Sequence, residues 1–122
     1  MFDRWVELAQ QDPDLVHRGR YVTAVVLVDR LDDSFVLSIR DGLVLSIEPK
    51  PRVMPEWTLT LRAPAGEWAA FWQPEPAPGS HDLMALLRRR VLVVEGNLHP
   101  FMANLRYFKD ILEIPRRKEV LA

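Results

Sequence analysis

An alternating pattern on either side of Asp41-Gly42 constrains the fold of this chain more than any other feature. Apolar residues recur at every second position, at Phe35, Leu37 and Ile39 before the dipeptide and at Leu43, Leu45 and Ile47 after it. A two-residue hairpin turn needs positive φ at both central positions, which Asp and Gly tolerate. The pattern therefore predicts a β-hairpin of strands 34–40 and 43–48, with these apolar side chains facing inward.

Three further segments are predicted to be strands. Residues 21–28 (YVTAVVLV) are apolar on both faces, which favours a central strand or one covered by helices. Residues 57–62 alternate, and residues 91–95 are short, apolar on both faces and followed by Gly96-Asn97. Three prolines within residues 49–55 exclude a regular ladder there, so we expect an exposed connection.

Four segments have the 3.6-residue periodicity of helices. Residues 2–10 form a short amphipathic pattern that Asp12-Pro13-Asp14 is expected to stop. A second helix follows Pro64, and a third is expected to be capped by Ser80 and to end at Arg88–Arg90. The last helix is predicted over 98–113, with an apolar stripe of Phe101, Met102, Leu105, Phe108 and Leu112.

This order of elements predicts an α+β fold in which helices pack on one face of a sheet. A chain of 122 residues suits one domain, 1–122, with a core of about 15–113 and a frayed tail over 116–122. Sixteen basic and seventeen acidic residues give a net charge of −1, which disfavours a nucleic-acid partner. The absence of cysteine excludes disulfides and thiolate chemistry.

The N-terminus and the apolar runs set the expected location. The first residues mix acids with apolar residues, unlike a signal peptide, and the longest apolar stretch is far shorter than the ~20 residues of a membrane span. We therefore expect a cytoplasmic protein without integral membrane association.

Few polar residues suggest chemistry. His17, His81 and His99 lack metal-ligand spacing, and the aspartates over 29–33 are interpreted as a turn between two strands. The arginines at 88–90 are interpreted as a solvated helix end. We therefore expect no catalytic residue, no metal and no cofactor.

The three helices after the fourth strand carry an excess of large apolar side chains. Such stripes are usually core, but short helices can also leave an apolar tunnel. The residues alone leave both interpretations open.

Three short motifs resemble the sterol-carrier-protein type 2 family of small lipid-binding domains. They are Asp41-Gly42 after an alternating strand, Trp57-Thr58-Leu59-Thr60-Leu61, and Val93-Val94-Glu95-Gly96-Asn97-Leu98 before the final helix. The resemblance covers about residues 15–113. It implies a five-stranded, mainly antiparallel sheet covered by helices, and a hydrophobic tunnel that holds sterols, fatty acids or fatty acyl chains without a metal.

The resemblance implies a non-catalytic lipid-binding or carrier domain whose partner is a lipid or other apolar small molecule. The tunnel would be lined by Leu59, Phe71, Trp72, Leu83, Leu87, Met102, Leu105 and Phe108. Whether the chain forms a homodimer stays open.

Two other functions remain alternatives. The first is a protein-interaction module with a filled core, in which exposed Trp57 or Trp68 would form a dimer or partner surface. The second is a small enzyme of the cone-shaped isomerase type. That class usually gathers its helices before most strands and places Asp or His deep in the pocket, whereas here the helices come late.

Overall fold

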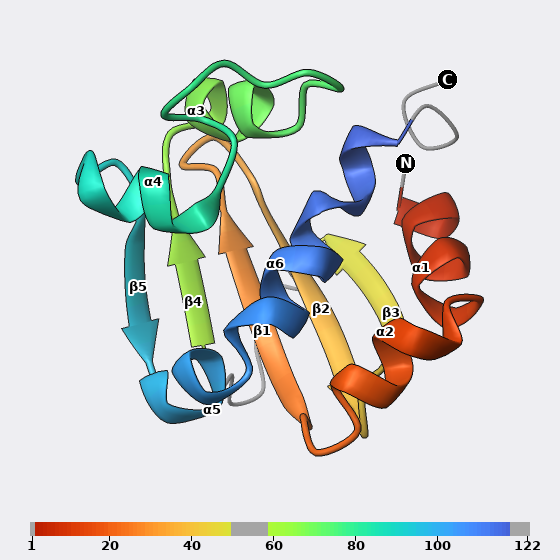
Figure 1. The fold of residues 1–122 in the computed structure, drawn as a ribbon. Helices are drawn as coiled ribbons and strands as arrows, with labels where there is room; N and C mark the ends of the chain where they lie inside the picture. Colours follow the sequence, from red (N-terminus) through yellow and green to blue (C-terminus); the bar gives the residue numbers. More distant parts are fainter. Residues whose placement is uncertain (1, 50–58, 118–122) are drawn as a thin grey trace.

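The computed structural model describes residues 2–49 and 59–117, which form a five-stranded mixed sheet with a layer of helices on one face (Figure 1). The sheet order is β3-β2-β1-β4-β5. The strands are β1 (Ala24–Asp29), β2 (Ser34–Arg40), β3 (Leu43–Pro49), β4 (Leu59–Arg62) and β5 (Val93–Gly96). Strand β1 pairs parallel with β4, and the other neighbours are antiparallel. The predicted α+β class and mainly antiparallel sheet are confirmed.

Strand β1 lies in the centre of the sheet, as its apolar sequence predicts. Val26 and Val28 face the helices and are 1% and 0% exposed. The strand begins at Ala24 rather than at Tyr21, whose side chain is 83% exposed. Before Ala24, the backbone oxygen of Val22 accepts the Gly42 N–H of the hairpin turn, and the Val22 N–H donates to Gly19 O.

The predicted hairpin turn is present, with positive φ at Asp41 (50°) and Gly42 (82°). The predicted inward facing holds for Ile47, which is buried, but is wrong for Leu45. A β-bulge opposite Ser38 and Ile39 leaves Leu45 without a partner in the register, so the alternation changes phase. Val44 is consequently buried, at 1% exposure, while Leu45 is 46% exposed.

Strand β5 is an edge strand and begins two residues later than predicted. Val93 pairs with Arg62 on the sheet face opposite the helices and is 46% exposed there, although the sequence suggested burial on both faces. The predicted start of β4 at Trp57, and most of the connection over 49–55, lie outside the described residues.

The helices cover the side of the sheet that faces the viewer in Figure 1. They are α1 (Phe2–Gln10), α2 (Pro13–Arg18), α3 (Ala65–Phe71), α4 (Leu83–Arg88), α5 (Leu98–Ala103) and α6 (Leu105–Glu113), followed by the 3₁₀ turn η1 (Ile114–Arg116). Helix α1 has the predicted boundaries, and α3 follows Pro64 as predicted.

One helix was missed by the sequence analysis, and two predicted helix features are wrong. Helix α1 ends before Asp12 as predicted, but the Asp12 carboxylate accepts the Leu15 N–H and caps a further helix, α2. The cap of α4 is Asp82 rather than Ser80, with the Asp82 carboxylate accepting the Met84 N–H. Asn104 leaves helical geometry (φ −127°, ψ 36°) and divides the predicted final helix into α5 and α6.

The core extends beyond the predicted limits of 15–113, since Trp5 and Ile114 are 0% and 1% exposed and belong to it. The predicted fraying of the tail does not hold for Arg116. Its guanidinium donates to the backbone oxygen of Phe71 at 2.6 Å and lies 4.5 Å over that residue's ring. Residues 118–122 lie outside the described part of the chain.

Tyr107 fixes α6 over the hairpin end of the sheet. Its hydroxyl donates to Gly42 O at 2.6 Å, and its ring lies directly against Gly19 at the end of α2. A Cβ at Gly19 would lie only 2.2 Å from Tyr107 Cε1, so this close approach requires glycine.

Gly19→Ala is expected to destabilise the fold by about 2–3 kcal/mol, because the buried Tyr107 ring must move to avoid the methyl group. Urea denaturation followed by circular dichroism measures the change. Gly66→Ala is the matched control, since nothing lies within 4 Å of its added Cβ in α3, and it is expected to be neutral or to stabilise by about 0.5–1 kcal/mol. Equal stability of the two variants would contradict the packing argument.

Candidate functional site

Four of the residues predicted to line a tunnel lie inside the core. Leu59, Phe71, Leu83 and Phe108 come from β4, α3, α4 and α6 and are at most 1% exposed. No water-sized space therefore adjoins these side chains, and the structure brings them together as a packed layer between the helices and the sheet.

The other four lie progressively nearer the surface. Trp72 is 7% exposed, Leu87 and Leu105 are half-buried and pack against the core, and Met102 is 56% exposed. Met102 is exposed because the break at Asn104 turns α5 away from the line of α6, so the predicted continuous stripe is interrupted. Five of the eight, which we call the apolar path, come from α4, α5 and α6 and range from buried to exposed: Leu83, Leu87, Met102, Leu105 and Phe108.

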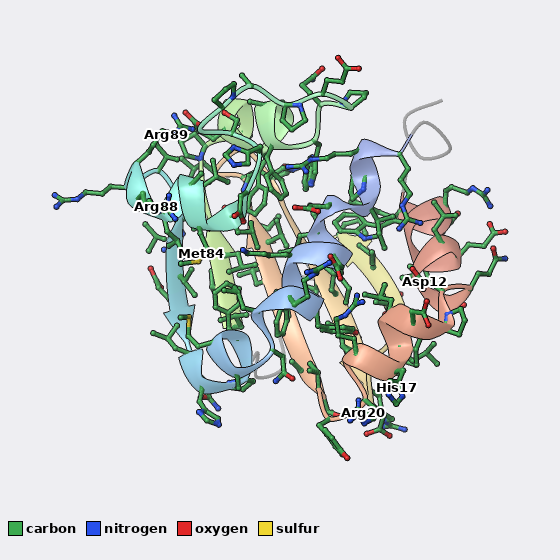
Figure 2. All side chains as sticks on the ribbon, viewed as in Figure 1. Asp12, His17, Arg20, Met84, Arg88 and Arg89 are labelled. Carbon is green, nitrogen blue, oxygen red and sulfur yellow. The ribbon has the colours of Figure 1, made fainter. Side chains whose placement is uncertain are left out.

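Two residues that the sequence analysis did not select belong near this path. Val94 pairs with Leu61 across β4 and β5, so it faces the helices, and it is half-buried against the core. Met84 is half-buried on α4, one helical turn before Leu87 (Figure 2). The i, i+3 spacing of Met84 and Leu87 indicates that they share a face of α4, so the sequence could have identified Met84. The facing of Val94 depends on strand register, which the sequence does not give.

Trp72 belongs to an aromatic cluster at the α1–α3 end of the helix layer. Its ring centroid lies 5.3 Å from Trp68, 5.9 Å from Trp5 and 6.2 Å from Phe35. Trp72 also lines a surface hollow of about 510 Å³ beside the β1–β2 turn. This cluster fixes one end of the helix layer by ring packing.

The position of Trp68 overturns part of the interaction-module alternative. Trp68 is 0% exposed, and its indole N–H donates to Asp29 O at 3.2 Å, so it forms no surface for a partner. Trp57 lies outside the described residues.

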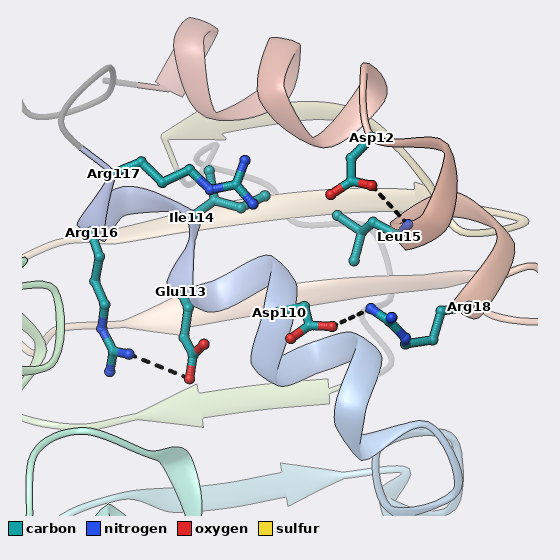
Figure 3. A pocket seen from close by; sticks show the side chains of 8 residues that line it. All are labelled: Asp12, Leu15, Arg18, Asp110, Glu113, Ile114, Arg116 and Arg117. Carbon is teal, nitrogen blue, oxygen red and sulfur yellow. Dashed lines mark hydrogen bonds and ion pairs between the residues drawn. The ribbon is translucent and has the colours of Figure 1, made fainter.

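A second hollow, of about 330 Å³, lies between α2 and the end of α6 and is rich in charge (Figure 3). Asp110 pairs with Arg18, and Arg116 lies 3.5 Å from Glu113. Burial raises the pKa of the Glu113 carboxyl, which Arg116 partly offsets, and burial lowers the pKa of Arg116. These pairs join α2, α6 and η1, and we assign them a structural role.

The histidines and the aspartate-rich turn lie where the sequence placed them. His17 and His99 are exposed on separate helices, and His81 Nδ1 accepts the Gly79 N–H at 3.3 Å. Arg30 N donates to Asp33 O, which closes the predicted turn. Within residues 2–49 and 59–117, no three His, Asp or Glu side chains are grouped so that they could hold a metal ion, and no helix could span a membrane.

Comparison with solved structures identifies this architecture. A crystal structure of sterol carrier protein 2 superposes with a TM-score of 0.76, covering 94% of this chain and 92% of that one at 10% sequence identity. The chain has the sterol carrier protein 2 fold. A ubiquinone synthesis protein, UbiJ-SCP2, matches with a TM-score of 0.60 at 16% identity, covering 93% of this chain and 90% of that one.

A sterol carrier protein domain of Helicoverpa armigera has a TM-score of 0.54 at 8% identity, covering 90% of this chain and 86% of that one. Neither family models nor curated proteins matched this sequence. At these identities the likeness establishes the fold, and function must be argued from this chain's own residues.

Glu113→Gln is expected to remove the cost of burying a carboxylate. Burial raises the pKa of Glu113 in the folded state above its ordinary value of 4.5. As the pH rises above 4.5, ionisation of Glu113 therefore favours the unfolded state, and the wild type loses stability relative to this variant. The variant's advantage should therefore be small near pH 4 and larger at pH 7. Urea denaturation at both pH values checks this, and an advantage that shrinks toward pH 7 would contradict the stated cause.

Proposed function

We propose that this chain is a non-catalytic lipid-binding domain that holds a fatty acyl chain or sterol-like molecule between the sheet and helices α4, α5 and α6. The observation that carries the proposal is the apolar path, whose members on α4, α5 and α6 grade from exposed Met102 through half-buried Leu105 and Leu87 to buried Leu83 and Phe108. The fold shared with a protein named sterol carrier protein 2 supports it.

Loading requires these side chains to move, because no water-sized space adjoins the buried members of the path. The elements nearest the opening are suited to this. Helices α4 and α5 have six residues each, and the non-helical Asn104 separates α5 from α6. Methionines at 84 and 102 supply unbranched side chains that adapt to different shapes. The proposed tunnel is therefore a space that the ligand opens.

The expected affinity follows from the apolar surface that a lipid transfers out of water. Burying about fourteen methylenes at ~0.8 kcal/mol each favours binding by about 11 kcal/mol. Association costs at least ~4 kcal/mol, and displacing side chains costs more. At most ~7 kcal/mol remains, so we expect a dissociation constant of roughly 10 μM or weaker for a long-chain fatty acid.

The direct test is native mass spectrometry of gently purified protein, followed by titration of the delipidated protein with a fluorescent fatty acid. We expect co-purified mass of lipid size and saturable binding at one molecule per chain. Lipid-free preparations together with no saturable fatty-acid binding up to about 100 μM would contradict the proposal.

Met102→Glu is expected to weaken fatty-acid binding about tenfold, because it places a charge at the surface end of the apolar path. Titration with the same fluorescent fatty acid measures it. Leu45→Glu is the matched control, since Leu45 is similarly exposed at 46% but lies on β3, and it should leave affinity unchanged. An equal loss of affinity in both variants would contradict a role for Met102 at the entrance of the lipid site.

A filled interior also favours the second candidate, a protein-interaction module. Val93, Leu98 and Met102 are each 46–56% exposed around the β5 edge, which suits contact with a second chain. Sedimentation velocity separates the two functions. A dimer that is lost in Leu98→Glu, in protein without lipid, would favour the interaction module.

A further inference from the structure

The chain around α4 starts and ends beside α3, and we call residues 79–90 the α4 segment. Arg89, near its end, donates from Nε to Gly79 O at 2.9 Å and pairs through Nη2 with Glu67 of α3 at 2.5 Å. Gly79 and Arg90 both have positive φ, 89° and 61°, a conformation that an arginine adopts only where contacts stabilise it. The two ends of the α4 segment are therefore held together at α3.

The middle of the α4 segment covers part of the core. Leu83 and Leu86 are both 0% exposed, and Leu87 is half-buried against the same core cluster. Leu83 and Leu87 are also members of the apolar path, together with buried Phe108 of α6. Movement of α4 away from α6 would therefore uncover the buried members of that path.

Two charged side chains tie the start of α4 to η1 and α6. Arg116 of η1 donates from Nη2 to His81 O and from Nε to Phe71 O, both at 2.6 Å. Lys109 Nζ lies 3.2 Å from Asp82 Oδ2. Bonds from a charged donor are stronger than bonds between neutral groups, whereas an ion pair near the surface contributes little. Arg116 is therefore the stronger of these two links between the α4 segment and the C-terminal helices.

We propose that the α4 segment is a lid over the apolar path, with hinges at Gly79 and Arg90 and a latch formed by the bond from Arg116 to His81 O. When the latch breaks, the start of α4 moves away from α6 and a lipid chain enters between Leu83 and Phe108. The latch forms again over the bound chain, so Arg116 is a positioning residue that sets the rate of exchange more than the affinity. This inference rests on the proposed lipid-binding function, although the motion itself needs no lipid.

Amide hydrogen exchange of the lipid-free chain tests the motion. The amides of Leu86 and Arg89, which bond within the α4 segment, should exchange about tenfold faster in Arg116→Ala than in the wild type, with the amides of α1 unchanged. Arg116→Lys keeps the charge and should restore most of the protection. Arg106→Ala is the matched control, because Arg106 pairs with Asp110 on its own helix, and it should leave exchange unchanged. Equal acceleration in α1 and α4 would overturn the lid.

Stopped-flow exchange of a fluorescent fatty acid tests the role of the latch. Loaded protein is mixed with excess palmitate to measure release, and lipid-free protein is mixed with the fluorescent fatty acid to measure uptake. In Arg116→Ala both rates should rise about fivefold while the dissociation constant changes less than about twofold, and Arg106→Ala should match the wild type. Weaker binding of the fatty acid with unchanged uptake would overturn the assignment of Arg116 as a latch.

A cross-link tests the lid without relying on Arg116. The chain has no cysteine, so Asp82→Cys and Lys109→Cys together introduce one unique pair, which a short bismaleimide joins. The same double variant capped with N-ethylmaleimide is the unlinked control. Release should be about tenfold slower in the linked form, and equal release would overturn the lid. No fatty-acid binding by the wild type would contradict the proposed function instead, and hydrogen exchange would still test the motion.

Discussion

Hydrogen bonds from buried aromatic side chains to the backbone hold α6 against the sheet, and the rest of the helix layer depends on that placement. Trp5 and Trp72 donate from α1 and from the end of α3 to the oxygens of Ile111 and Leu112, at 3.0 and 2.8 Å. At the other end of the sheet Tyr107 donates to a hairpin oxygen. Such bonds are strong where water is excluded, and leaving the buried indole N–H and hydroxyl donors unpaired would be costly. They therefore fix both the position and the rotation of α6.

As a consequence, the two sides of the helix layer differ in how firmly their side chains are packed. On the side of α1 and α3, interlocking indole and phenyl rings hold the packing rigid. On the side of α4, the ion pair of Lys109 with Asp82 at 3.2 Å links this helix to α6, and both side chains are about a quarter exposed. Pairs near the surface contribute little stability. Opening for a lipid is thus least costly beside α4 and α5, where apolar side chains also reach the surface.

The sequence predicted the fold class because its strongest patterns are local. The turn at Asp41-Gly42, the helix over 2–10 and the apolar central strand each follow from residue type and period. The wrong predictions concern features that tertiary contacts determine. The bulge that exposes Leu45 depends on pairing between strands, and the exposure of Met102 depends on a break at Asn104 that apolar periodicity does not reveal. The hollow beside Trp72 combines a turn with a helix more than 30 residues further along the chain, so no local pattern could indicate it.

The central claim is that a lipid chain enters between the sheet and helices α4–α6. Intermolecular nuclear Overhauser effects between ¹³C-labelled palmitate and the unlabelled side chains of the protein test it most directly. The account predicts contacts from the acyl methylenes to Leu83, Leu87 and Phe108, accompanied by shifts along α4 and α5. Contacts confined to exposed residues such as Leu98 and Val93, with the Leu83 and Phe108 resonances unchanged, would contradict it.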